Sequence, residues 1–249
     1  MKYLETKKKP GFFKFLRSII AFFYGKKRFE GVENMPETPS IYVGNHAQLH
    51  GPLMSELYFP KKKLIWCIGN MMSRKELPSY AFEDFWSMKP KWTHWFYKFL
   101  AHLIAPIASY CFNHADCIGV YKDARIMNTF KETINALNEN INVVIFPEGR
   151  KKYNEIVNEF QDKFIDCARL YYSKYKKCVA FVPTYFCPKL KKAIFGKPIV
   201  YDPNIEISEQ RKIICDYLKN EITALAKELP VHTVVPYDNI PKKMYPKSK

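Results

Sequence analysis

The sequence lacks the cysteine spacing of a disulfide-stapled or zinc-binding protein. Its seven cysteines are odd in number, and no two are spaced as C-x-x-C; they stand at positions 67, 111, 117, 167, 178, 187 and 215. Disulfide frameworks and zinc sites both need regular cysteine patterns. We therefore expect neither a disulfide framework nor a metal site, and a reducing compartment is the natural setting.

A long uninterrupted apolar run is also absent near the N-terminus. Residues 12–24 are rich in Phe, Leu and Ile, but Lys14 and Arg17 interrupt them, and a spanning helix needs about 20 apolar residues. For the same reason we expect no cleavable signal peptide. Apolar positions 12, 16, 19, 20 and 23 follow helical spacing, so residues 1–30 are predicted to form a basic, aromatic segment at a membrane interface. An amphipathic helix packed on the protein's own core is the open alternative.

Acidic residues are scarce. The chain has 24 Asp and Glu against 40 Lys and Arg, which gives a net charge of +16, and 16% of its residues are aromatic. Such an excess predicts an anionic partner, and the aromatic content favours an anionic membrane surface or a phosphorylated substrate. No helix-turn-helix, RNA-recognition sheet or zinc finger is visible, so nucleic acid is not the expected partner; binding through bulk charge would show a steep salt dependence.

The best candidate for a general base follows a predicted strand. Residues 41–43 are apolar and largely β-branched, and the run stops at Gly44. Asn45 and His46 are then expected at the carboxyl end of a strand, the edge where open α/β sheets bind ligands. Pro52 suits the start of the next helix, which leaves His46 in a connecting loop. The ordinary pKa of imidazole, near ~6.5, suits a base at neutral pH.

A metal-binding interpretation of this segment is weaker. His46 and His50 are four residues apart, as in H-E-x-x-H zinc sites. Gln48 stands where that motif has glutamate, and Pro52 disfavours a helix there. We therefore predict no metal.

Apolar runs and helical periodicities alternate along the chain. Further strands are predicted at 64–68, 117–122, 141–146, 179–183 and 194–199, with helices at 53–57, 130–137, 160–171 and 208–229. This alternation predicts an α/β fold, in which a central, mostly parallel sheet is flanked by helices.

An aromatic segment interrupts this alternation between residues 81 and 112. One helical face would carry five large apolar residues: Trp92, Trp95, Phe96, Phe99 and Leu103. Pro106 is expected to end or kink that helix. The face has three interpretations, which are an acyl-chain sleeve, a membrane-interface surface and ordinary core packing.

Taken in order, the short motifs resemble those of the glycerolipid acyltransferases that make phosphatidic acid (the 1-acylglycerol-3-phosphate type, PlsC-like). Asn45-His46 follow one predicted strand, Phe146-Pro147-Glu148-Gly149 follow another, and Val182-Pro183 belong to a third; the resemblance runs from Gly31 to Pro198. It implies a glycerolipid-acyltransferase-like fold. It also implies transfer of a fatty acyl group from acyl-CoA or acyl carrier protein to a glycerol-phosphate or lysophosphatidate-like acceptor, with the acyl thioester as a substrate and no cofactor.

The resemblance also implies the site residues. His46 matches the catalytic base, and the substrate-binding positions correspond to Arg74, Lys122, Glu148, Gly149 and Arg150. In the family an aspartate five positions after the histidine orients its ring, but that position here is Gly51. His50, Glu56, a residue distant in sequence, Asn45, the His46 backbone or an ordered water are the candidate substitutes. The comparable Asp-to-Asn change in serine hydrolases costs ~10⁴ in turnover.

Two functions therefore follow from the sequence. The first is a membrane-associated acyltransferase, peripheral on the cytoplasmic face of the cell membrane. The second is a non-catalytic lipid-phosphate binder that retains the crevice. In either case the expected organisation is an interface segment at residues 1–30, an acyltransferase-like domain at 31–230 and a Pro- and Lys-rich tail at 231–249.

Overall fold

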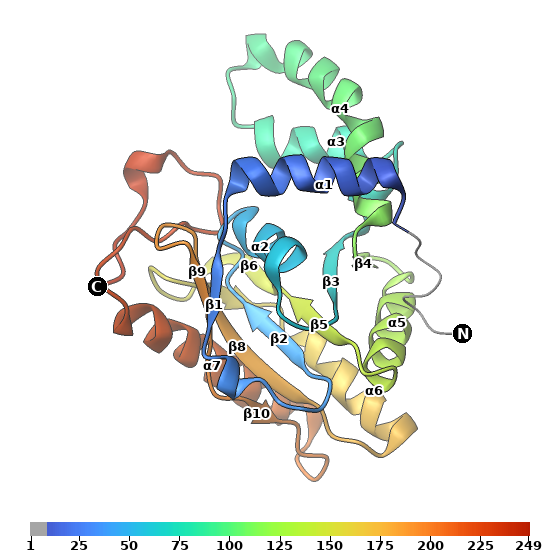
Figure 1. The fold of residues 1–249 in the computed structure, drawn as a ribbon, viewed down its shortest axis with the longest axis vertical. Coiled ribbons are helices and arrows are strands. Elements are labelled where there is room, and N and C mark those ends of the chain that lie inside the picture. Colours follow the sequence, from blue (N-terminus) through green and yellow to red (C-terminus); the bar gives the residue numbers. More distant parts are fainter. Residues whose placement is uncertain (1–8) are drawn as a thin grey trace.

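The structure, a computed structural model, describes residues 9–249 (Figure 1). Residues 1–8 of the predicted interface segment lie outside the described residues. A mixed sheet forms the centre, in the order β1-β9-β8-β2-β5-β3-β4, with β10 paired to β8. The bounds of its strands are β1 (Arg28–Glu30), β2 (Ile41–Gly44), β3 (Lys63–Ile68), β4 (Cys117–Val120), β5 (Asn142–Ile145), β8 (Ala180–Cys187), β9 (Lys192–Phe195) and β10 (Ile199–Val200).

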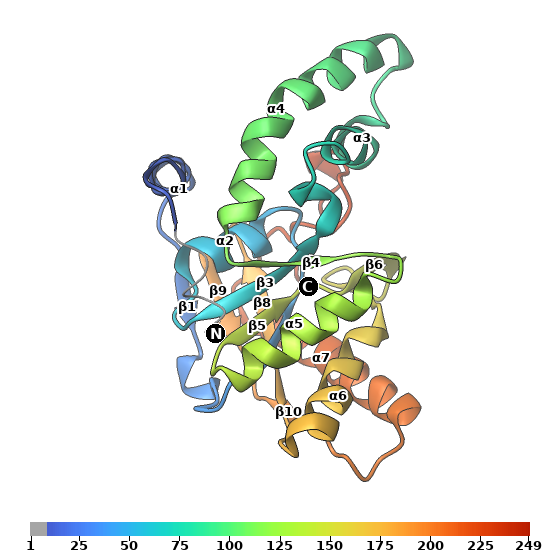
Figure 2. The same cartoon turned by 90° about the vertical axis from the view of Figure 1, so that its right-hand side faces the viewer.

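Helices flank both faces of this sheet. Figure 2 shows α5, α6 and α7 on one side and α1 and α2 on the other, while α3 and α4 project beyond the sheet. Their bounds are α1 (Gly11–Tyr24), α2 (His50–Tyr58), α3 (Leu77–Ala81), α4 (His94–His114), α5 (Ile126–Asn138), α6 (Asp166–Tyr175) and α7 (Ile207–Glu228). The predicted α/β class, with a central and mostly parallel sheet flanked by helices, is confirmed.

Parallel pairing joins the strands that matter for the site. β2 lies between β5 and β8, and β5 pairs in parallel with β3, which pairs in parallel with β4.

The predicted single strand over 194–199 is wrong, because β9 ends at Phe195 and β10 begins at Ile199. Gly196 still donates its N–H to the Pro183 carbonyl of β8, at 2.8 Å, but Pro198 has no N–H to donate to a ladder.

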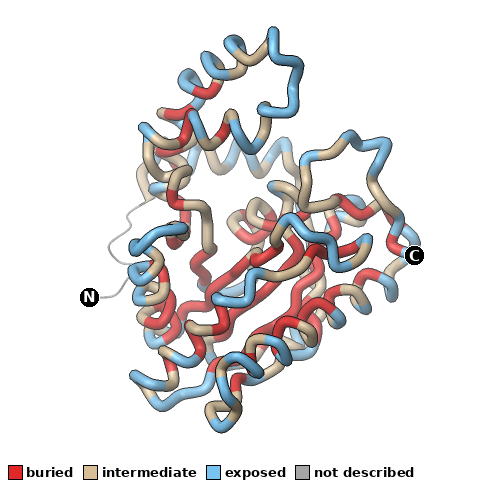
Figure 3. The backbone as a smooth tube through the Cα atoms, turned by 180° about the vertical axis from the view of Figure 1, so that it is seen from behind, coloured by how far each residue is buried: buried red, intermediate tan, exposed pale blue. Residues whose placement is uncertain are grey.

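Alternation along β2 divides the core between the two faces of the sheet. Ile41 and Val43 pack with residues of α5, α6 and α7, whereas Tyr42 faces the α1 side and packs with Phe13 and Phe195. Figure 3 shows buried backbone running through the strands, with exposed segments around them. Because side chains alternate along a strand, the carboxyl end of β2 is held from both sides.

Large apolar side chains on α1 and α4 face away from this core. Phe22 and Phe23 of α1 are 81% and 82% exposed. Trp92, in the 3-10 helix Lys91–Thr93 just before α4, is 78% exposed, and Trp95 of α4 is 72% exposed. Ordinary core packing is therefore the wrong explanation for the aromatic face of α4. Pro106, expected to end or kink the helix, does not end it, since α4 continues through it to His114. In the part of the chain that the structure describes, no helix is both long and apolar enough to cross a bilayer.

The C-terminal tail folds back across the sheet edge. Val234 donates its N–H to the Pro246 carbonyl at 2.9 Å, and Ser248 donates its N–H to the His232 carbonyl at 3.0 Å. His232 is itself anchored, since its Nε2 lies 2.8 Å from the Tyr185 hydroxyl of β8. These contacts bring residues 237–245 to the loop that follows β2.

Candidate active site around His46

The loop after β2 begins from a fixed point. Asn45 is buried, and its side-chain amide exchanges two hydrogen bonds with the Phe186 backbone of β8, at 3.1 and 2.7 Å. Ala47 and Gln48 then take left-handed backbone conformations, with φ of 45° and 55°. Two such non-glycine residues in succession cost of order 1–3 kcal/mol each. Strained backbone is thus used to turn the chain sharply around His46.

That turn brings the Gln48 carbonyl oxygen to the His46 ring. The carbonyl is the hydrogen-bond partner of His46 Nδ1. Since a carbonyl oxygen only accepts, Nδ1 carries the proton and the lone pair of the neutral ring lies on Nε2. A neutral backbone group therefore fills the orienting role that the family gives to aspartate.

Glu148 holds the backbone of the same residue. It begins β6 (Glu148–Lys152), which pairs with β7 (Asn158–Phe160) in a small antiparallel sheet. One carboxylate oxygen accepts the His46 N–H and the other accepts the Asn158 N–H, the latter at 2.9 Å. Burial raises the pKa of Glu148 to about 7, against the opposing effect of these two N–H donors. Glu148, which follows β5, thus links the loop after β2 to the start of β7 through its carboxyl group.

Two aromatic rings enclose the imidazole. The ring centroids of Phe146 and Tyr237 lie 5.4 and 5.6 Å from that of His46, and both meet it edge-on. The resulting burial lowers the pKa of His46 below 6.5, while the Gln48 carbonyl and the charge of Asp84 act to raise it. The neutral, proton-accepting ring is therefore the form present at neutral pH.

Asp84 and Arg150 complete the electrostatic surroundings. Burial raises the pKa of Asp84, and the charges of His46 and Arg150 oppose that rise. Asn239 of the tail donates its side-chain N–H to the Asp84 carbonyl at 3.3 Å. Gln48 bonds the same tail, through the Tyr245 hydroxyl at 2.8 Å. An anion and a cation from distant segments thus lie within electrostatic range of the His46 ring.

No protein-family model matches the chain, and no curated protein matches it. Among the solved structures to which the chain is similar is the 1-acyl-sn-glycerophosphate (LPA) acyltransferase, PlsC, from Thermotoga maritima, with 17% identity and a TM-score of 0.48 over 86% of this chain and 80% of that chain. A likeness of this size assigns no activity to the present chain.

The structure brings together some of the predicted site residues. His46 and Glu148 are hydrogen-bonded, Gly149 accepts the Asn158 side-chain N–H at 2.8 Å, and Arg150 is exposed beside them. Lys122 is exposed two residues beyond the end of β4. Because β4 is the third strand from β2 in the sheet, the end of β4 lies roughly 14 Å from the end of β2.

Arg74 stands on a different segment of the chain from the other predicted site residues. It is exposed in the turn between the 3-10 helix Gly69–Met72 and α3. The sequence pattern missed two close neighbours of His46, Asp84 and Tyr237, because both come from segments with no matched motif. Neither has a signal in the sequence that would have found it.

The other proposed substitutes for the aspartate are engaged elsewhere. His50 Nδ1 lies 2.9 Å from the Tyr24 hydroxyl of α1, and Glu56 binds Lys63 at 2.6 Å. His46 Nδ1 and His50 Nδ1 thus bind different partners, the Gln48 carbonyl and the Tyr24 hydroxyl. Among residues 9–249 no group of three or more His, Cys, Asp or Glu side chains is placed to hold a metal ion.

Proposed function

We propose that the protein is an acyltransferase that moves a fatty acyl group from acyl-CoA or acyl carrier protein to a glycerol-phosphate or lysophosphatidate-like acceptor. One observation carries the proposal. His46 is a neutral imidazole at the carboxyl edge of a parallel sheet, with its ring oriented by Gln48 and its backbone fixed by Glu148. Such an edge is where this class of sheet binds its ligands.

In the proposed reaction His46 Nε2 takes the proton from the acceptor hydroxyl. The hydroxyl oxygen attacks the carbonyl carbon of the thioester, the carbon–sulfur bond breaks, and the leaving thiolate takes the proton from the imidazolium. The Gln48 carbonyl dipole and the Asp84 charge stabilise the imidazolium, since both favour the protonated ring.

Cations at the same sheet edge would bind the acceptor's phosphate. Arg150 is the nearest candidate because its charge acts on Asp84 beside His46, and a guanidinium suits bidentate phosphate binding. Arg74 and Lys122 are exposed farther along and would contact a longer substrate or the phosphates of the donor. Glu148 and Gly149 would form the floor of the acceptor site.

The proposed place of action is a membrane surface. The apolar faces of α1 and α4 are exposed, and aromatic side chains beside basic ones favour the interface of an anionic bilayer. We propose peripheral attachment at the cytoplasmic face, where an acyl donor and a lipid acceptor would meet.

A specific observation favours the second candidate, a non-catalytic lipid-phosphate binder. The partner of His46 Nδ1 is an uncharged carbonyl, which stabilises an imidazolium less than a carboxylate does. A non-catalytic binder would keep the cations at the sheet edge but would not cleave the thioester.

A thioester assay separates the two candidates. Acyl-CoA is offered with glycerol 3-phosphate or lysophosphatidate, and His46→Ala is compared with His102→Ala, a histidine exposed on α4. The acyltransferase loses roughly 10²–10⁴-fold in rate with His46→Ala alone. A binder shows no thioester cleavage in the wild type and still binds phosphatidate vesicles. Equal turnover by wild type and His46→Ala contradicts the proposed role of His46.

A further inference from the structure

A cationic cavity lies away from the His46 site, between α1, α2 and the start of β3. Its volume is about 220 Å³. A water molecule occupies about 30 Å³ in the liquid, so the cavity has room for a phosphate group and its first ester carbons. Five cationic residues line it, namely Lys9, Arg17, Lys61, Lys62 and Lys63.

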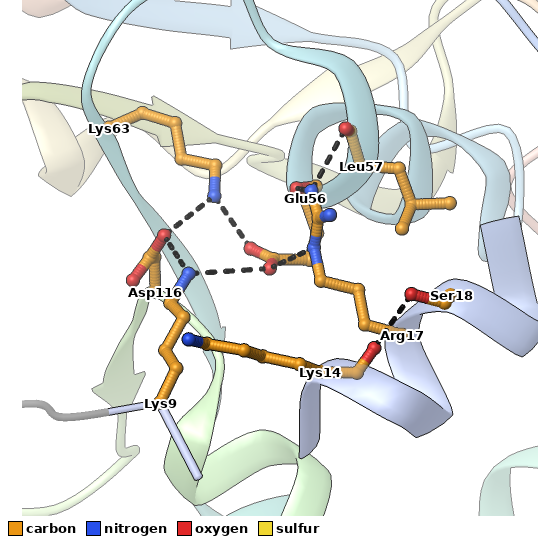
Figure 4. Close-up of polar contacts among 8 residues, drawn as sticks. All are labelled: Lys9, Lys14, Arg17, Ser18, Glu56, Leu57, Lys63 and Asp116. Atoms are coloured by element: carbon orange, nitrogen blue, oxygen red, sulfur yellow. Dashed lines mark hydrogen bonds and ion pairs between the residues drawn. The ribbon is translucent and has the colours of Figure 1, made fainter. Parts of the chain in front are cut away.

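Two carboxylates in the wall already share three of these cations (Figure 4). The buried Lys63 ammonium lies 2.6 Å from Glu56 and 3.2 Å from Asp116. Lys9 lies 2.7 Å from Asp116. Arg17 lies 3.4 Å from Glu56 and donates to the Glu56 and Leu57 carbonyls, both at 2.9 Å.

The wall therefore keeps a positive surplus. Five cations against two carboxylates leave three positive charges around the cavity. Lys61 and Lys62 contribute two of them and are exposed. The Lys61 ammonium donates to the Pro36 carbonyl at 2.8 Å, and because this acceptor is neutral the charge of Lys61 stays uncompensated. A surplus of this kind, partly shielded from solvent, favours an anion with several acceptor oxygens.

The position of α1 indicates which anion. Arg17 directs its side chain at the cavity wall, while Phe12, Phe15, Phe22 and Phe23 of the same helix are exposed. An amphipathic helix buries its apolar face about 5–10 Å into the headgroup boundary, and a helix is roughly 10 Å across. A cavity on the body side of α1 would then lie at the depth of the lipid phosphates.

We propose that this cavity binds the phosphate of an anionic phospholipid headgroup, as a site separate from the acceptor site at His46. Lys63 opens β3, and His46 follows the carboxyl end of β2 in the same parallel sheet, so the two sites lie at opposite edges. The lipid assignment rests on the proposed membrane attachment through α1.

The test uses full-length protein and an anionic lipid that is neither substrate nor product of the proposed reaction. Binding to phosphatidylcholine vesicles with and without phosphatidylglycerol is measured for the wild type and for Lys61→Ala/Lys62→Ala. The matched control is Lys176→Ala/Lys177→Ala, an adjacent exposed pair at the end of α6. We expect roughly tenfold or more weaker binding to the anionic vesicles for the first pair only.

Soluble probes identify the source of the phosphate. Dihexanoyl phosphatidylglycerol is expected to saturate the wild type and not Lys61→Ala/Lys62→Ala, and inorganic phosphate is expected to bind more weakly. Equal affinity for inorganic phosphate overturns the lipid assignment. Equal loss of vesicle binding in both double variants, or no saturable binding of the soluble lipid, overturns the site.

The same variants keep this proposal distinct from the acyltransferase. Turnover of water-soluble substrates by Lys61→Ala/Lys62→Ala is expected to equal that of the wild type. His46→Ala is expected to keep its affinity for phosphatidylglycerol vesicles.

Discussion

The edge of the Phe146 ring occupies the space that a side chain at Gly51 would need. A Cβ atom there would lie 2.6 Å from Phe146 Cε1 and 2.9 Å from the carbonyl oxygens of Asn45 and His46. Two of these three contacts are with backbone, which cannot swing aside. The missing aspartate is therefore a difference in packing as well as in chemistry.

Restoring that aspartate is predicted to damage the protein. Gly51→Ala and Gly51→Asp are both expected to destabilise it by about 1–3 kcal/mol, because each forces atoms into an occupied space. Gly51→Asp is also expected to leave thioester turnover unimproved. Urea unfolding measures the first effect, with Gly11→Ala as control because nothing lies within 4 Å of a Cβ there. A gain in turnover with unchanged stability would show that the loop accepts an acidic partner.

The charge of Asp84 is predicted to raise the pKa of His46 and so to set the acid limb of the pH–rate profile. Burial lowers the pKa of His46 below 6.5, and Asp84 opposes this effect by favouring the protonated ring. Asp84→Asn removes that opposition, so the His46 pKa falls further and the acid limb of the pH–rate profile moves to lower pH. Histidine NMR titration reports the same shift without turnover. The control is Glu83→Gln, an exposed neighbour, and an equal shift in both variants contradicts a specific pairing.

Glu148 is predicted to make stability fall as pH rises. Its folded-state pKa is about 7 against an ordinary 4.5, so between these values the unfolded chain has released a proton that the folded chain keeps. Unfolding free energy then declines across pH 4.5–7, by up to about 3 kcal/mol from this group.

Glu148→Gln removes this titration. The glutamine side chain has one oxygen in place of two, so it accepts only one of the N–H groups of His46 and Asn158. The stability difference between wild type and Glu148→Gln is expected to narrow from pH 5 to pH 8, measured by urea unfolding. The control is the exposed Glu33→Gln. A constant difference would mean that Glu148 titrates normally.

The sheet could be predicted from the sequence because each of its buried strands is a short apolar run. The runs at 41–43, 64–68 and 141–146 match β2, β3 and β5 closely, since strands covered on both faces are apolar throughout. The same reasoning placed His46 and Glu148 at one sheet edge, because both follow parallel strands.

The partner of the His46 ring could not be predicted in this way. Its hydrogen bond to Gln48 depends on left-handed backbone at Ala47 and Gln48, and neither residue type signals that conformation. Asp84 and Tyr237 reach the site through tertiary packing of an aromatic segment and a Pro- and Lys-rich tail. Local sequence patterns carry no information on contacts between segments that are distant in the sequence.

Exposed phenylalanines on α1 are predicted to hold the protein at a bilayer. Phe22 and Phe23 are more than four-fifths exposed, while Phe13 on the opposite side of the helix is buried. Fully burying a Phe side chain contributes about 1.5–3 kcal/mol, so Phe22→Ser/Phe23→Ser is expected to weaken vesicle binding by at least roughly 100-fold. Its unfolding free energy is expected to match the wild type, because neither ring packs in the core.

The matched control is Met127→Ser/Ile213→Ser, which removes two exposed apolar side chains from α5 and α7 on the far face of the sheet. This pair is expected to bind vesicles as the wild type does. If both double variants lose binding equally, general surface hydrophobicity explains the attachment. If neither loses it, Phe22 and Phe23 do not enter the interface, which contradicts attachment through α1.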